Sequence, residues 1–150
     1  MTVIKSRIRV SADGTLSGPA DGLPPGEHDA EITISDGAAR PDARTLVPGR
    51  LLRSIVAELA PQRIIVFGSR ARGDARPDSD IDLIVVLDDD VPLEKLGAKA
   101  IHAARGDYHQ PLDIIPYRAS VLAKRARAIG SFAHIVLRDG ITVYERPRAT

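Results

Sequence analysis

A glycine–serine pair followed closely by two aspartates is the part of this sequence best suited to chemistry. Gly68 and Ser69 follow the apolar run RIIVF, and Asp80 and Asp82 begin the apolar run IDLIVVL. Glycine lets a phosphate approach the backbone because it has no Cβ, and the free N–H groups at a helix start attract anions. A serine there can bind a phosphate oxygen or cap the helix. The pair therefore predicts a phosphate-binding turn, with a plain helix cap as the alternative.

Asp80 and Asp82 are candidate ligands for a divalent cation. Side chains alternate along a strand, so these two residues would project to the same side, roughly 6–7 Å apart at Cα. Two carboxylates held in this way repel each other and lose hydration, so the arrangement is rarely found where the residues have only a structural role. Mg²⁺ removes that penalty, and it prefers one or two carboxylates together with phosphate oxygens. The alternative is a solvated strand end.

Asp113, inside the apolar run PLDII, is a third candidate. A lone acid within an apolar strand needs a partner. Beside Asp80 and Asp82 in a sheet, it would complete a two-metal site and could take a proton from an attacking hydroxyl. The alternative is a salt bridge to a nearby arginine. Arg70 and Arg72, next to the Gly-Ser turn, are suited to bidentate contacts with phosphate.

The segment GSRARGDARPDSDIDLIVV resembles the signature of minimal nucleotidyltransferase (MNT) domains in the DNA polymerase β superfamily. That signature is a Gly-Ser turn, Asp-x-Asp on a following strand and a third Asp on a later strand. The resemblance covers about residues 48 to 146 and implies a polymerase β-like α/β (α+β) fold, a mixed sheet with flanking helices. It implies that the catalytic residues, which also bind two Mg²⁺ ions, are Asp80, Asp82 and Asp113. The implied nucleotide-binding residues are Gly68 and Ser69, to which we add Arg70 and Arg72.

The activity implied by this resemblance is Mg²⁺-dependent nucleotidyl transfer. An acceptor hydroxyl would attack the α-phosphorus of a nucleoside triphosphate such as ATP, and pyrophosphate would leave. Small MNT proteins commonly accompany a helical HEPN toxin, so the resemblance implies an antitoxin that transfers AMP to a tyrosine of that partner. Two alternatives stay open: a small-molecule nucleotidyltransferase acting on an aminoglycoside-like hydroxyl, and a non-catalytic binding antitoxin. The intact acid triad argues against the second, and the lack of an acceptor-binding lobe argues against the first.

Alternating helices and strands are expected to position these residues. Apolar residues at helical spacing predict helices at 51–59, 92–104 and 120–129, with 131–137 continuing the last one. Nearly continuous apolar runs predict strands at 63–67, 81–87, 112–115 and 141–144. This order predicts a mixed sheet with helices packed on it.

The N-terminal part is expected to form a separate β extension over residues 1–36. Asp13-Gly14 is a strong hairpin signal, and Ala30, Ile32 and Ile34 alternate with polar residues as in a half-buried strand. The extension resembles the β-hairpins of AbrB-type antitoxins, and an oligomerisation arm is the alternative. Residues 37–47 are expected to be a linker, and residues 48–150 the nucleotidyltransferase domain.

Composition narrows the class of protein. The 150 residues include no cysteine, which excludes disulfides and thiolate metal sites, and the net charge of +1 argues against a dedicated nucleic-acid binder. No apolar run approaches the ~20 residues that span a bilayer. The N-terminus lacks the apolar region of a signal peptide, so we expect a cytoplasmic protein without a membrane partner.

Overall fold

The computed structural model describes residues 9–10, 13, 16–17 and 41–148, and the chain divides into the units Met1–Ile34 and Ser35–Thr150. In the first unit, β1 (Arg9–Val10) pairs antiparallel with β2 (Leu16–Ser17), and Asp13 lies in the turn between them. This agrees with the predicted hairpin. The strand predicted around Ile32 lies outside the described residues.

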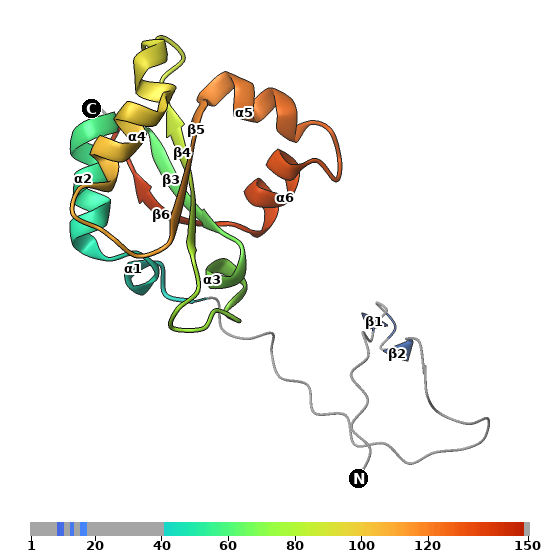
Figure 1. The fold of residues 1–150 in the computed structure, drawn as a ribbon. Coiled ribbons are helices and arrows are strands. Elements are labelled where there is room, and N and C mark those ends of the chain that lie inside the picture. The colour runs from blue at the N-terminus through green and yellow to red at the C-terminus, as the bar shows by residue number, and fades with distance from the viewer. Residues whose placement is uncertain (1–8, 11–12, 14–15, 18–40, 149–150) are drawn as a thin grey trace. The chain divides into compact units, whose positions relative to one another are not determined.

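A four-stranded mixed sheet forms the centre of the second unit (Figure 1). Its order is β5-β4-β3-β6, in which β3 pairs antiparallel with both β4 and β6, and β4 pairs parallel with β5. The bounds are Arg63–Phe67 for β3, Ile81–Leu87 for β4, Leu112–Arg118 for β5 and Ile141–Glu145 for β6. The predicted mixed sheet is confirmed. β5 continues through Pro116, which an edge strand tolerates.

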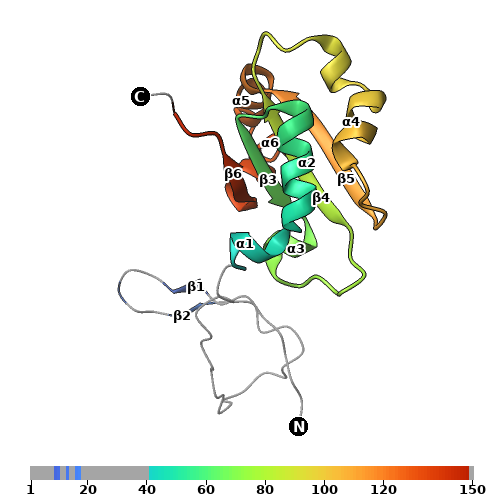
Figure 2. The same cartoon turned by 90° about the vertical axis from the view of Figure 1, so that its left-hand side faces the viewer.

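Two pairs of helices cover the two faces of this sheet (Figures 1 and 2). α2 (Gly49–Leu59) and α4 (Ala98–Arg105) pack on one face, and α5 (Ala119–Ala126) and α6 (Phe132–Asp139) on the other. β4 serves both cores, because Leu83 and Val85 pack with the first pair and Ile84 and Val86 with the second. A short helix, α3 (Ser69–Arg72), connects β3 to the chain leading into β4. None of the helices in the described residues is long and apolar enough to cross a bilayer.

Two predicted helices are interrupted in the structure. The one expected at 92–104 is a 3-10 helix, η1 (Leu93–Leu96), followed after Gly97 by α4. The helix expected at 120–129 ends at Ala126, and Gly130 has φ +80°, a left-handed conformation that keeps the chain from continuing as one α-helix into residues 131–137. A new helix, α6, then begins with Ser131 as its N-cap, whose side chain accepts a hydrogen bond from the His134 N–H.

The segment predicted as a linker contains a helix of its own. α1 (Ala43–Leu46) begins after Asp42, whose side chain accepts a hydrogen bond from the Arg44 N–H. Leu46 and Val47 are buried in the core that α2 and α4 share with the sheet. The end of the segment is thus part of the packed unit, while the domain boundaries drawn from the sequence stay a prediction.

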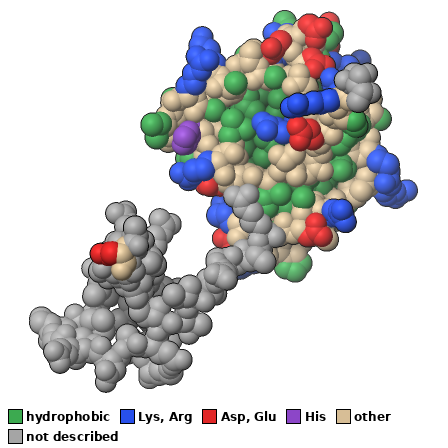
Figure 3. Space-filling model, turned by 180° about the vertical axis from the view of Figure 1, so that it is seen from behind, with side chains coloured by type: hydrophobic (Ala, Val, Ile, Leu, Met, Phe, Trp, Pro, Cys, Tyr) green, Lys and Arg blue, Asp and Glu red, His purple; other side chains and the backbone are tan. Residues whose placement is uncertain are grey.

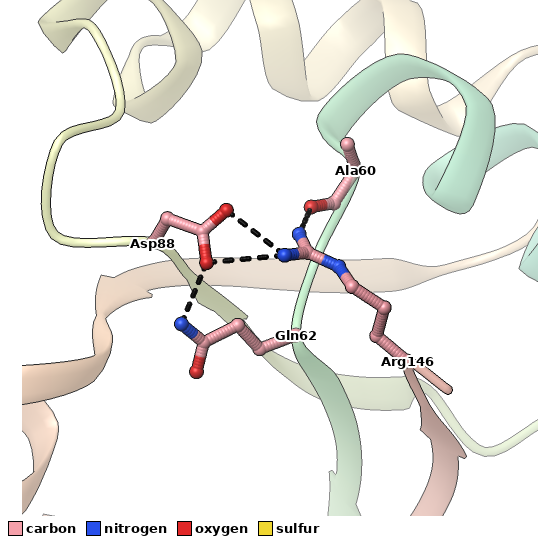
Figure 4. A network of polar contacts seen from close by, with 4 residues as sticks. All are labelled: Ala60, Gln62, Asp88 and Arg146. Carbon is pink, nitrogen blue, oxygen red and sulfur yellow. Dashed lines mark hydrogen bonds and ion pairs between the residues drawn. The ribbon is translucent and has the colours of Figure 1, made fainter. Parts of the chain in front are cut away.

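A polar network fixes the C-terminal end of β4 (Figure 4). Asp88 accepts hydrogen bonds from Gln62 Nε2 at 2.6 Å and from Arg146 Nη1 at 3.0 Å, and Arg146 also donates to the carbonyl of Ala60. These hydrogen bonds lower the pKa of Asp88. Because Asp88 lies six residues from Asp82, roughly 20 Å along the strand, the network holds the end of β4 opposite to the candidate site.

Candidate active site

The sheet brings Asp82 and Asp113 side by side. Asp82 on β4 is the Cα partner of Asp113 on β5, and across the other edge of β4 it is the partner of Phe67 on β3. Neighbouring strands lie about 4.8 Å apart, so the two aspartate backbones are at this separation. Asp80 is two residues before Asp82, directly ahead of the first residue of β4. The parallel pairing of β4 with β5 therefore assembles acids that are far apart in the sequence.

Asp82 and Asp113 face the same side of the sheet. Ile81 and Leu83, on either side of Asp82, are buried in the core under α2 and α4, so Asp82 projects to the opposite face. Ile114 is buried in that same core, so Asp113 before it also projects to the face that carries α5 and α6. The alternation inferred from the sequence holds for both strands, and the acids share one face.

The acids at this edge of the sheet are not neutralised by any salt bridge within the described residues. Burial raises the pKa of Asp82, and the charges of Asp113 and Asp80 raise it further, while Arg72 and Arg70 act in the opposite direction. Repulsion among the carboxylates therefore exceeds the compensation from the nearby arginines. A cation placed between the acids would relieve it.

Asp113 differs from its sequence interpretation in one respect. It was expected to be a lone acid within an apolar strand, whereas it is exposed. The reason is that β5 is an edge strand, and Asp113 lies near its start. Within the described residues, Asp113 forms no salt bridge to an arginine, so that alternative does not hold. An exposed carboxylate without a cationic partner can bind a metal or accept a proton.

The donor set fits Mg²⁺ only in combination with a further ligand. Among the described residues, no three His, Asp or Glu side chains stand close enough to hold a metal ion by themselves. Mg²⁺ retains several non-protein oxygens and is commonly held by one or two carboxylates plus substrate phosphates. Mutually repelling carboxylates at the edge of the sheet match that pattern. Asp80, Asp82 and Asp113 are thus candidate ligands for a metal that arrives with a triphosphate.

Gly68 touches the carboxylate of Asp82. Its φ is +73°, and a Cβ at this position would lie 2.5 Å from Asp82 Oδ2. Both the left-handed backbone and the close approach require glycine. The sequence interpretation assigned this glycine to phosphate approach alone. The additional contact follows from the pairing of Phe67 with Asp82, which the sequence did not reveal.

Ser69 does not cap the helix that follows it. Gly68 occupies the N-cap position of α3, no side-chain hydrogen bond caps this helix, and Ser69 is the first helical residue. The backbone carbonyl of Ser69 accepts hydrogen bonds from Gly73 N and from Asp74 N. The alternative of Ser69 as a plain helix cap therefore does not hold, and its hydroxyl is not engaged as a cap.

Arg70 and Arg72, which were grouped as phosphate ligands, have different surroundings. Arg70 is partly buried and donates from Nη2 to the carbonyl of Ser79 at 2.7 Å and from Nε to the carbonyl of Asp80 at 3.3 Å. It thereby fixes the chain just before β4. Arg72 is exposed and forms an ion pair with Asp74 at 3.4 Å. No sequence signal indicated the contacts of Arg70 with carbonyls nine and ten residues later.

The chain is similar to known proteins over part of its length. A search of curated proteins found no match. One matching crystal structure is of a Sulfolobus solfataricus protein assigned as a nucleotidyltransferase; it is 21% identical, with 65% of this chain and 79% of that chain covered and a TM-score of 0.42. A family model described as "Nucleotidyltransferase domain" matches residues 50–128, more than half of the chain, a range that includes Gly68 and the three aspartates. The chain therefore belongs to the nucleotidyltransferase domain family.

Proposed function

We propose that this protein uses Mg²⁺ to transfer AMP from ATP to a hydroxyl of a protein partner, a tyrosine of a helical toxin of the HEPN type. Membership of the nucleotidyltransferase family supports transfer of a nucleotidyl group. The observation that carries the proposal is the register that places Asp82 beside Asp113, with Gly68 against the Asp82 carboxylate. The Gly68–Ser69 turn and the aspartates together form one site for a metal-bound triphosphate.

Each residue has a defined part in the transfer. Asp80, Asp82 and Asp113 hold two Mg²⁺ ions, which supply charge neutralisation for the phosphates when bound. The Gly68–Ser69 turn binds the triphosphate. Asp113, exposed at the edge strand, accepts the proton of the acceptor hydroxyl. The hydroxyl oxygen forms the new bond to the α-phosphorus, the bond from that phosphorus to the bridging oxygen breaks, and pyrophosphate leaves with the electron pair.

The openness of the site favours a protein acceptor. Asp80 and Asp113 are exposed, and four cavities found elsewhere in the described residues are lined by other side chains. Enzymes that modify small molecules generally enclose most of the ligand surface in a cleft. An acceptor presented on the surface of another protein needs no such enclosure. The aminoglycoside-like acceptor is therefore the weaker alternative.

The test is intact-mass spectrometry of this chain co-expressed with a candidate helical toxin of the HEPN type. We expect AMP additions on the partner, and we expect their loss in Asp113→Asn while the complex persists. An unmodified partner that is still neutralised by Asp80→Asn/Asp82→Asn would establish a binding-only antitoxin. Modification of an aminoglycoside by the isolated chain would establish the small-molecule enzyme. Either result would overturn the proposal.

A further inference from the structure

A groove runs between α5 and α6 on the face of the sheet that carries the acids. Its volume is about 600 Å³. The lining is mainly apolar, and it consists of Tyr117, Val121, Ala128, Ser131, Phe132 and Ala133, with Lys124 and Arg125 at its side. α5 and α6 lie together, apart from α2 and α4, in Figure 1. No part of the described chain fills this groove.

The surroundings of the groove expose apolar side chains. Of six large hydrophobic residues that are exposed in the described part of the chain, five lie on α5, on α6 or in the turn between them: Val121, Ile129, Phe132, Ile135 and Leu137. Ile129 is 90% exposed. A concentration of exposed apolar side chains on one pair of helices is typical of a surface that another molecule covers.

The same segment is strongly positive. Between Tyr117 and Arg138 the sequence has five Lys or Arg residues and no Asp or Glu, although the whole chain carries a net charge of only +1. Arg118 turns inward to the carbonyl of Val91, and Arg138 pairs with Asp139. The remaining three cations, Lys124, Arg125 and Arg127, are exposed. Seen from behind, the surface as a whole carries both positive and negative side chains (Figure 3).

Phe132 connects the groove to the strand that leads into the candidate active site. The Phe132 ring packs edge-on against Phe67, with 5.3 Å between the ring centroids, and Phe67 directly precedes Gly68 and pairs with Asp82. Along β5, Asp113 and Tyr117 are four residues apart and project to the same face, about 13 Å from each other. A helix seated in the groove would therefore reach the acids with its next two to three turns.

We propose that this groove binds an amphipathic helix with acidic flanks in the acceptor protein, and so brings the acceptor hydroxyl to the aspartates. The proposal rests on the transfer to a protein hydroxyl argued above. Helices bind grooves through apolar side chains at i, i+3, i+4 and i+7, and acidic residues beside that stripe would meet Lys124, Arg125 and Arg127. A second copy in symmetric contact would bring these like charges together, and RNA would leave the apolar side chains uncovered.

The probe is a fluorescein-labelled helical peptide of about 18 residues, five turns, with a leucine stripe, glutamate flanks and one tyrosine near its end. We expect it to bind wild type with an affinity that falls as salt rises. Lys124→Glu/Arg125→Glu should weaken binding by about tenfold or more, and a peptide with lysine flanks should prefer this variant. The control, Arg53→Glu/Lys99→Glu, makes the same charge change on exposed positions of α2 and α4 and should bind like wild type.

Three results would overturn the groove as the docking site. The first is that the groove variant and its control bind the peptide equally well. The second is that wild type binds a labelled uridine oligonucleotide more tightly than the peptide and that the groove variant loses this binding. The third is that wild type sediments as a dimer and the groove variant as a monomer. Transfer from α-labelled ATP to the peptide tyrosine separates the two proposals. If the groove variant transfers AMP to the peptide as fast as wild type, the groove is overturned as the docking site and the proposed function stands. If the peptide binds in the groove but receives no AMP, the proposed function is overturned and the groove stands.

Discussion

Gly68 lies so close to Asp82 that a Cβ on the glycine would stand 2.5 Å from Asp82 Oδ2. The glycine belongs to the turn that follows β3, and the carboxylate belongs to the neighbouring strand β4. The candidate phosphate turn and the candidate metal ligand are therefore in contact, and a change in one displaces the other.

Gly68→Ala should abolish most of the transfer activity, because the added Cβ pushes the Asp82 carboxylate out of place. Gly73→Ala is the matched control. Gly73 also has a positive φ, +80°, but the nearest atom to its Cβ is Pro41 Cγ at 3.6 Å, an ordinary contact. Gly73→Ala should lose about 1–2 kcal/mol of stability from its left-handed backbone, and Gly68→Ala should lose at least as much, because φ +73° with ψ −150° is a conformation almost confined to glycine. Equal activities of the two variants, measured as nucleotidyl transfer, would refute the contact as the cause.

Ser69→Ala should leave thermal stability unchanged and weaken nucleotide binding. The Ser69 side chain does not cap α3, so its removal does not cost the roughly 1 kcal/mol of a lost N-cap. Loss of one hydrogen bond to a phosphate should reduce ATP affinity by about 1–2 kcal/mol. Calorimetric titration measures the ATP affinity, and thermal melts of the same preparation measure the stability. A lower melting temperature with unchanged ATP affinity would return Ser69 to a structural role.

Arg70→Ala should destabilise the fold more than Arg72→Ala. Arg70 loses two charge-assisted hydrogen bonds to the carbonyls of Ser79 and Asp80, so we expect a loss of about 1–3 kcal/mol in the free energy of unfolding. Arg72 loses only an exposed ion pair, which contributes at most about 1 kcal/mol. Urea denaturation measures the difference. Equal losses would mean that Arg70 does not hold the chain entering β4.

Asp82→Asn should stabilise the metal-free protein at neutral pH. Burial and the charges of Asp113 and Asp80 raise the Asp82 pKa above its ordinary value of 3.8, so the folded state binds the proton more tightly than the unfolded state does. The contribution of Asp82 to stability is thus present below 3.8 and is lost as pH rises through the raised pKa. The gain from Asp82→Asn should shrink as pH falls. A gain independent of pH, in urea denaturation at several pH values, would contradict this.

The sequence predicted β3 and β4 with their observed bounds because both are continuous apolar runs that end at glycine, proline or charged residues. It also predicted that Asp80 and Asp82 would share a face, which stays a prediction because Asp80 lies before the first residue of β4. The pairing of Asp82 with Asp113, in contrast, depends on the parallel register of β5 with β4, a tertiary relationship between two strands that α4 separates in the sequence. The break between α5 and α6 was missed because the apolar spacing continues across Gly130. Arg70 and Gly68 contact β4 and the residues just before it through tertiary interactions, and secondary-structure propensity carries no information about such contacts.

The most direct test of the account is calorimetric titration of ATP with Mg²⁺ into wild type and into Asp80→Asn/Asp82→Asn. Asp78→Asn/Asp90→Asn is the control, since it also removes two carboxylate charges, from exposed positions outside the candidate site. We predict that wild type and the control bind ATP only when Mg²⁺ is present, and that Asp80→Asn/Asp82→Asn does not bind it while remaining folded. Equal, Mg²⁺-independent ATP binding by all three proteins would contradict the assignment of these acids as the metal site.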